Sequence, residues 1–131
     1  MSESFWGAIP AAASIATPNS ILTEQGRILK DATKGALVGE TTKKGFNGGF
    51  QIDFFLRAES LNNYKFYLFK VLHDVELYPL AIISNNQMRY ECGTEESFKK
   101  NLREILSSDS TRKIIEALLA QIRDDSDDIP F

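Results

Sequence analysis

The first regular pattern of apolar positions runs from residue 18 to residue 36. Apolar or small side chains recur there every three or four residues, which places them on one face of a helix. Thr17 can cap this helix through its hydroxyl group, Pro18 suits the first helical position, and Gly35 is typical of a helix end. The pattern predicts an amphipathic helix with one face formed by Ile21, Leu22, Gln25, Ile28, Leu29, Ala32 and Ala36.

Between Leu37 and Cys92 the spacing of apolar positions changes to two, which is the period of a half-buried β-strand. The strongest signal covers residues 50–58, where large apolar side chains occupy every second position. The glycine-rich segment 43–49 is interpreted as a turn, and residues 45–49 within it as a mobile hairpin loop. Short connections between successive strands favour an antiparallel meander. The expected strands cover residues 37–42, 50–58, 64–73, 77–84 and 87–92.

Helical spacing returns after Gly93 and continues to Arg123. Thr94 is suited to cap a first helix there, and Asp109 begins a second one. The predicted fold class is α+β, with an antiparallel four- or five-stranded meander and one N-terminal and two C-terminal helices packed mainly on one face. The predicted organisation is an irregular N-terminal arm at residues 1–17, a single domain at 18–123 and an acidic tail at 124–131.

The negative charge of the chain is concentrated at its end. The 131 residues, enough for one domain, include 15 Lys and Arg and 18 Asp and Glu, and four of the Asp lie in the last eight residues. The remaining body therefore carries 15 basic and 14 acidic side chains. A strongly basic body would indicate binding to a phosphate backbone, and this balance argues against it.

The chain has one cysteine, Cys92, and one histidine, His73. A lone thiol excludes an internal disulfide, and these two residues alone exclude a tetrahedral zinc site built from Cys and His. The N-terminal apolar stretch has Glu3 in place of a basic leading segment and is broken by Pro10, which argues against a signal peptide. No apolar run is long enough to span a bilayer. We therefore expect a cytoplasmic protein with no cofactor and no membrane contact.

Catalytic chemistry has little support in the sequence. His73, Asp74 and Glu76 lie close together, but no Ser or Cys stands in a recognisable nucleophile context and no second His can complete a relay. The carboxylates of the predicted sheet do not show the ligand spacing of a calcium or magnesium site. We expect His73 to be a surface or half-buried hydrogen-bonding residue, Cys92 to be a small buried one, and the chain not to be an enzyme.

The last eight residues are Asp124, Asp125, Ser126, Asp127, Asp128, Ile129, Pro130 and Phe131. Four carboxylates lead into a stiff proline and a terminal phenylalanine, which carries both an aromatic ring and the α-carboxylate. This stretch resembles the C-terminal tip of bacterial single-stranded-DNA-binding proteins. The resemblance implies that the tip docks repair and replication enzymes, whose pockets take the final ring while basic residues take the carboxylates.

The resemblance covers only these eight residues. In that family the body is an OB-fold barrel followed by a long linker, whereas here two amphipathic helices run almost directly into the acidic segment. DNA binding is therefore not carried over with the tip. Two other interpretations stay open: a tail that only keeps the protein solvated, and a tail that folds back on basic residues of its own domain, namely Lys99, Lys100, Arg103, Arg112 and Lys113.

Aromatic and basic residues of the predicted sheet form a second group of candidates. Phe55, Tyr67 and Phe69 are expected on the sheet face opposite the core, interleaved with basic side chains. Such a surface can stack unpaired bases. A sheet buried on both faces, or a contact between two copies of the chain, would produce the same pattern. The candidate nucleic-acid-binding residues are Phe55, Arg57, Lys65, Tyr67 and Phe69.

Three functions follow from these features. The first is a non-enzymatic interaction protein of DNA metabolism that presents its tip to a replication, recombination or repair enzyme, in imitation of the host single-stranded-DNA-binding protein, as would suit a phage or mobile element. The second is a single-stranded nucleic-acid-binding protein that uses the aromatic strands. The third is a small immunity or defence-system adaptor. The sequence leaves the partner and the oligomeric state open, including a homodimer.

Overall fold

The computed structural model describes residues 3–11 and 15–127. Within them the chain forms one five-stranded antiparallel sheet and three α-helices, which confirms the predicted α+β class. The strands follow one another in the sheet in chain order, as expected of a meander. The elements are α1 (Pro18–Ala32), β1 (Val38–Phe46), β2 (Gly49–Ala58), the 3-10 turn η1 (Glu59–Leu61), β3 (Tyr64–His73), β4 (Leu80–Ser84), β5 (Arg89–Cys92), α2 (Glu95–Leu106) and α3 (Asp109–Asp127).

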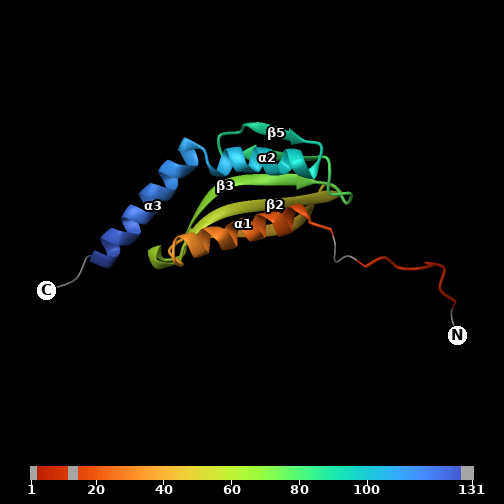
Figure 1. Ribbon diagram of the computed structural model, residues 1–131, viewed down its shortest axis with the longest axis horizontal. Coiled ribbons are helices and arrows are strands. Elements are labelled where there is room, and N and C mark those ends of the chain that lie inside the picture. The colour runs from red at the N-terminus through yellow and green to blue at the C-terminus, as the bar shows by residue number, and fades with distance from the viewer. Residues whose placement is uncertain (1–2, 12–14, 128–131) are drawn as a thin grey trace.

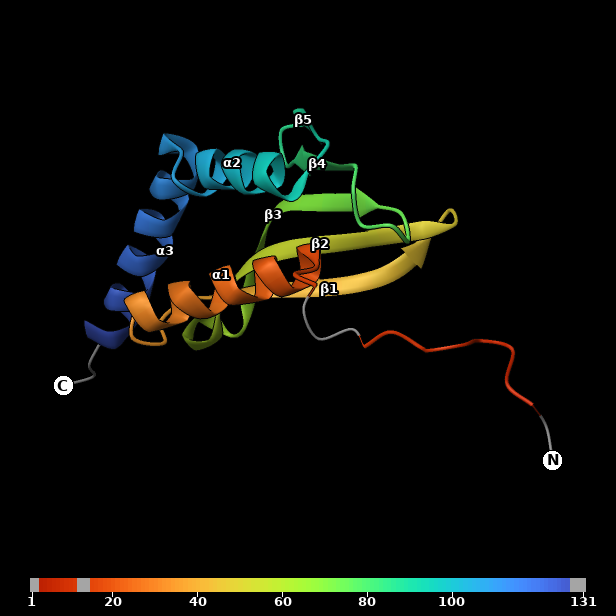
Figure 2. The same cartoon turned by 45° about the vertical axis from the view of Figure 1, so that its right-hand side comes forward.

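The helices gather on one side of the sheet (Figures 1 and 2). α1 packs along β1, α2 contacts β5, and α3 runs past the end of the sheet where it meets η1. Their apolar sides and the facing side of the sheet form a single core, whose largest members are Phe54, Phe69 and Phe98. No helix of the described residues covers the opposite face of the sheet, so its side chains are the ones offered to solvent or to a partner.

α1 and β1 meet at the level of the backbone. A Cβ atom added to Gly26 of α1 would lie 2.1 Å from the carbonyl oxygen of Gly39 in β1. A Cβ atom added to Gly39 would lie 2.6 Å from the Cα atom of Gly26 and 2.6 Å from the ring of Phe54. Because only hydrogen atoms fit between these positions, the two glycines set how closely α1 approaches the sheet.

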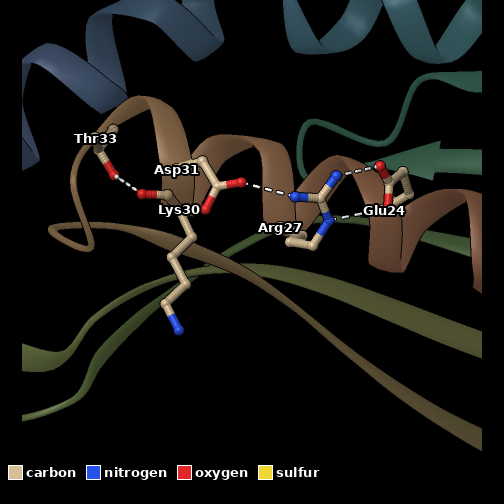
Figure 3. A network of polar contacts seen from close by, with 5 residues as sticks. All are labelled: Glu24, Arg27, Lys30, Asp31 and Thr33. Atoms are coloured by element: carbon tan, nitrogen blue, oxygen red, sulfur yellow. Dashed lines mark hydrogen bonds and ion pairs between the residues drawn. The ribbon is translucent and has the colours of Figure 1, made fainter.

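The start of α1 follows the sequence prediction. Thr17 Oγ1 accepts a hydrogen bond from the amide of Ser20 at 3.0 Å, which caps the helix. On the exposed side, Arg27 bridges Glu24 and Asp31, one turn away on either side (Figure 3). Water screens exposed pairs of this kind, so they contribute little to stability and burial of the opposite face holds α1 in place.

α1 ends at Ala32, earlier than its apolar pattern suggests. Lys34 and Gly35 have φ values of 55° and 84°, and this left-handed backbone turns the chain away from the helix axis. Thr33 Oγ1 closes the end by donating to the Leu29 carbonyl oxygen at 2.9 Å. The prediction that Ala36 continues the helical face is therefore wrong, whereas the breaking role of Gly35 is confirmed.

β1 and β2 are joined by only two residues. Asn47 and Gly48 have φ values of 49° and 80°, the left-handed pair that a type I′ hairpin turn requires. Residues 43–46 continue β1 and pair with β2 up to Phe46 opposite Gly49. A hairpin at this place was predicted correctly, but the turn predicted over residues 43–49 is too long, because only Asn47 and Gly48 lie outside the paired strands.

A β-bulge in β3 changes which side chains share a face. Phe54 is opposite Phe69, yet the next residue, Phe55, is opposite Tyr67, so Leu68 is an extra residue on β3. An extra residue interrupts the alternation of faces. Phe69 therefore enters the core, where its ring lies 5.1 Å from that of Phe54 between centroids. The prediction that Tyr67 and Phe69 share the outer face is wrong.

Candidate partner-docking site

α3 carries the predicted docking tail. The helix is anchored near its start by Thr111, a buried residue whose hydroxyl group donates to the Ile105 carbonyl oxygen at 2.7 Å, and further along by the buried Leu118. Ile122 is half-buried, Arg123 and Asp124 are exposed, and the end of the helix lies at one extremity of the molecule, away from β4 and β5 (Figures 1 and 2). The acidic segment therefore starts from a helix end at the edge of the molecule.

The structure places the predicted partner-binding residues in two groups. Asp124, Asp125 and Asp127 belong to the last turn of α3, which continues four residues beyond the predicted helix end at Arg123. The tail therefore begins as helix, and the expectation that its first residues lie outside the helix is wrong. Asp128, Ile129, Pro130 and Phe131 lie outside the described residues.

The charge of this last turn opposes the helix dipole. The C-terminal end of a helix carries a partial negative charge, so basic side chains stabilise it and acidic ones do not. α3 has Asp124, Asp125 and Asp127 there and no basic residue in its last turn. Each unfavourable charge costs on the order of 0.3–1 kcal/mol at low salt. A partner that binds the acidic residues in an extended conformation therefore needs little free energy to unwind the last turn of α3.

The open face of the sheet brings together four of the five predicted nucleic-acid-binding residues. The rings of Phe55 on β2 and Tyr67 on β3 lie 5.8 Å apart between centroids and are tilted by 57°. Lys65 Nζ lies 5.8 Å from the centroid of the Phe55 ring, and Arg57 is the register partner of Lys65. Phe69 is not part of this group, because it is fully buried on the opposite face.

Glu40 of β1 completes the cluster, and sequence reasoning missed it. Its carboxylate lies 2.7 Å from Lys65 Nζ and 3.3 Å from Arg57 Nε. The side chains of Glu40 and Arg57 are only 30% and 26% exposed, so this charge network is partly shielded from water. The signal that could have revealed it is Asn47-Gly48: a two-residue turn at that position sets β1 and β2 in a register that puts Glu40 opposite Phe55.

The electrostatics of the open face do not favour a phosphate backbone. One carboxylate is shared by two cations, so a nucleic acid would have to displace Glu40 before it could use either of them. The pKa of Tyr67 is raised, first by burial and then by the nearby Asp53 carboxylate, so its hydroxyl group stays neutral at physiological pH. The result is a two-ring apolar patch surrounded by charges that largely compensate one another.

Of the residues that suggested acid–base chemistry, only His73 lies in the core, whereas Asp74 and Glu76 are exposed. His73 is 5% exposed, more buried than predicted, and its Nδ1 donates to the Asp74 carbonyl oxygen at 2.7 Å. Cys92 is buried as predicted; its Sγ accepts a hydrogen bond from Asn101 at 3.4 Å, and burial raises the pKa of the thiol. In residues 3–11 and 15–127 no group of three or more His, Cys, Asp or Glu is arranged to hold a metal ion.

No family model, curated protein or solved structure matches this chain. In the part of the chain that the structure describes, no helix is both long enough and apolar enough to cross a membrane. What the chain does must therefore be inferred from its own residues, chiefly the acidic end of α3 and the open face of the sheet.

Proposed function

We propose that this chain is a non-enzymatic interaction protein of DNA metabolism, acting in the cytoplasm. It presents its C-terminal tip to a replication, recombination or repair enzyme. The observation that carries the proposal is the sequence of the last five residues, Asp-Asp-Ile-Pro-Phe, attached to the projecting end of α3. The proposal requires that Phe131 carry the free α-carboxylate, which mass analysis of the C-terminal peptide from cells would verify.

Each part of the tip contributes a different term to docking. Burial of the Phe131 ring is worth roughly 1.5–3 kcal/mol. A free carboxylate suits an Arg side chain or a cluster of backbone amides. Pro130 restricts the peptide before it binds and so reduces the entropy lost on docking. The four Asp steer the encounter towards a basic surface, which raises the association rate more than the final affinity.

The experiment is a capture of partners from cell lysate by the intact chain and by a variant lacking Phe131. We expect DNA-processing enzymes in the first sample and their loss from the second, because the ring and the position of the carboxylate are removed together. Phe5→Ala is the matched control, since Phe5 is a 92% exposed phenylalanine at the other end of the chain. Partners that persist without Phe131 would contradict the proposal and favour the immunity or defence adaptor.

A second function, binding of single-stranded nucleic acid, is favoured by one observation, the Phe55 and Tyr67 rings with Lys65 beside them. Stacking of a base on an aromatic side chain is worth roughly 1–3 kcal/mol. If this face binds DNA, Glu40→Gln should strengthen binding to an oligo-dT probe and steepen its salt dependence, because Arg57 and Lys65 would be released. Equal and negligible binding of the wild type and the variant across the salt series would eliminate this function.

A further inference from the structure

The helical side of the molecule contains a groove whose chemistry matches the tip. A cavity of about 350 Å³ lies between α1 and α2 and is lined by Ile21, Gln25, Lys99, Leu102, Arg103, Leu106 and Ser107. A second cavity of about 200 Å³ shares Gln25 and Leu106 with the first and continues along α1, over Phe54 of the core, to Thr111 and Ile115 of α3. We call these two adjoining cavities the α1–α2 groove. The larger one lies within the range of about 300–1,000 Å³ that ligand pockets occupy.

The groove combines an apolar floor with a basic rim. Leu102 is 3% exposed, and Ile21 and Leu106 are half-buried, so an aromatic ring placed there would be largely shielded from water. Arg103 is exposed and forms no ion pair with any residue that the structure describes. Lys99 Nζ contacts Glu95 at 2.8 Å, but both side chains are more than 40% exposed, and a surface pair of this kind is weak enough to exchange partners.

The charge of this rim is complementary to the tip of the same chain. Arg103 and Lys99 line the same cavity as the apolar floor, and the tail supplies four Asp and the α-carboxylate. The body of the chain is otherwise nearly balanced in charge. Two basic residues beside an apolar floor therefore distinguish this groove from the rest of the surface as a site for an acidic peptide. An acidic peptide that ends in Ile-Pro-Phe has the chemistry that this groove would recognise.

The geometry of α3 decides which copy of the tip can reach the groove. α3 runs from Asp109 to Asp127, a length of about 27 Å at 1.5 Å per residue. Ser107, which lies at the α2 end of the groove, is two residues before α3, so it lies at least about 20 Å from Asp127. The four residues after Asp127 span at most about 14 Å when fully extended. A tip attached to an intact α3 therefore does not reach the Ser107 end of the groove in its own molecule.

We propose that the α1–α2 groove binds the Ile129–Phe131 tip of a second copy of this chain. The inference rests on the proposed function, since it takes the same tip to be a docking peptide, and it adds a regulatory step: in the absence of a partner, copies hold one another's tips. Such a contact is heterologous: the tip of one copy meets the groove of the next, head to tail. Linear assemblies of more than two copies can therefore form as the protein concentration rises. A partner enzyme must then compete for the tip.

The test is the concentration dependence of the molecular mass of the full chain, measured by analytical ultracentrifugation at low salt. We expect reversible association of the wild type that weakens as salt rises, and weakening by about tenfold or more in a variant lacking Phe131, because the buried ring is lost. Arg103→Glu should weaken association to a similar extent. Lys100→Glu is the matched control, since it reverses the same charge on the same helix outside the groove.

A mixing experiment tests the head-to-tail arrangement directly. The variant lacking Phe131 keeps its groove, and Arg103→Glu keeps its tip, so each alone should stay monomeric while an equimolar mixture forms a one-to-one dimer. A mixture that stays monomeric, or an Arg103→Glu variant that associates like the wild type, would overturn the inference. Circular dichroism and thermal unfolding of both variants verify that each is folded before mixing.

Two further outcomes separate this inference from its rivals. In the first outcome the wild type stays monomeric, and a labelled Asp124–Phe131 peptide binds the variant lacking Phe131 more tightly than it binds the wild type. This result would mean that each chain covers its own groove with its own tip after its last helical turn unwinds. The second-copy proposal would then be wrong. Capture of partners from lysate tests the proposed function separately. Arg103→Glu should capture more partner than the wild type, because its tip is released from the groove of the second copy. If partner capture requires Phe131 but the wild type shows no self-association, the proposed function is supported and the second-copy proposal is wrong.

Discussion

At the scale of single residues, the contact between Gly26 and Gly39 is the most sensitive point of the fold. Alanine is the better helix former by about 1 kcal/mol, yet a Cβ on Gly26 would lie 2.1 Å from a backbone oxygen that cannot move aside cheaply. We expect Gly26→Ala to lower the free energy of unfolding by about 1–3 kcal/mol, as overpacking does. Urea denaturation measures this. Gly93→Ala, where the added Cβ meets no atom within 4 Å, is the control and should change stability little.

Tyr78 makes a prediction about alkaline stability. Its hydroxyl group is buried and has no hydrogen-bond partner among the described residues, and burial, helped by the nearby Glu95 and Cys92, raises the pKa of Tyr78 to about 12. Between pH 10 and about 12 the unfolded chain therefore loses this proton while the folded chain keeps it. The contribution of Tyr78 to stability is complete below pH 10 and is lost as the pH rises through that window.

Tyr78→Phe should remove this part of the alkaline loss. At pH 7 its stability should equal or slightly exceed that of the wild type, because the substitution deletes an unpaired buried hydroxyl group. Thermal unfolding of both proteins at pH 7, 10 and 11.5 measures the difference. A constant difference across the three pH values would show that Tyr78 ionises alike in the folded and unfolded chain.

At the scale of elements, the Asn47-Gly48 turn fixes the register that places Glu40 beside Arg57 and Lys65. Gly48 has a φ of 80° and no atom within 4 Å of an added Cβ, so a substitution there acts through the backbone alone. We expect Gly48→Val to cost about 1–2 kcal/mol of stability, the penalty for an L-residue in the left-handed region. Asn47→Gly, which suits the same turn, is the control. Equal denaturation midpoints for both variants would contradict this account of the turn.

The same elements show which features the sequence could predict. Periods of 3.6 and 2 located the helices and strands correctly, because each element buries one face and its apolar spacing records that face. The bulge at Leu68 could not be read in this way, since Leu68 and Phe69 are both apolar and both buried, so alternation looks intact whichever of them is the extra residue. Phe69 was assigned to the outer face for that reason.

The candidate site shows a similar limit. Phe55, Arg57, Lys65 and Tyr67 were found because they lie on two strands with clear alternation, joined by a short turn. Glu40 was missed because it contacts Arg57 and Lys65 only once β1 pairs with β2 as a third strand. The register of that pairing was not predicted, because the glycine-rich residues at the end of β1 were interpreted as a turn. The extension of α3 to Asp127 was also missed, since three acids at the end of a helix oppose its dipole and argue for an earlier end.

At the scale of the whole molecule, the proposed docking assigns the electrostatic attraction to the Asp residues of the tail and the apolar contact to its last three residues. These two contributions can be tested separately. The body is nearly balanced in charge, whereas four Asp are concentrated between Asp124 and Asp128. We therefore propose a variant in which these four Asp become Asn while Ile129, Pro130 and Phe131 are kept. The variant retains the ring and the α-carboxylate but loses the charges that steer the encounter.

The expected result depends on salt. At about 50 mM salt the Asn variant should capture several-fold less of each Phe131-dependent partner than the wild type, because exposed charges act over roughly one Debye length. At about 0.5 M salt the two should capture similar amounts, since screening removes the advantage of the wild type while the ring still buries its apolar area. The variant lacking Phe131 should capture little at either concentration. Quantitative mass spectrometry of the captured proteins measures all three chains, and a deficit of the Asn variant that persists at high salt would mean that the Asp side chains make close contacts and do more than steer.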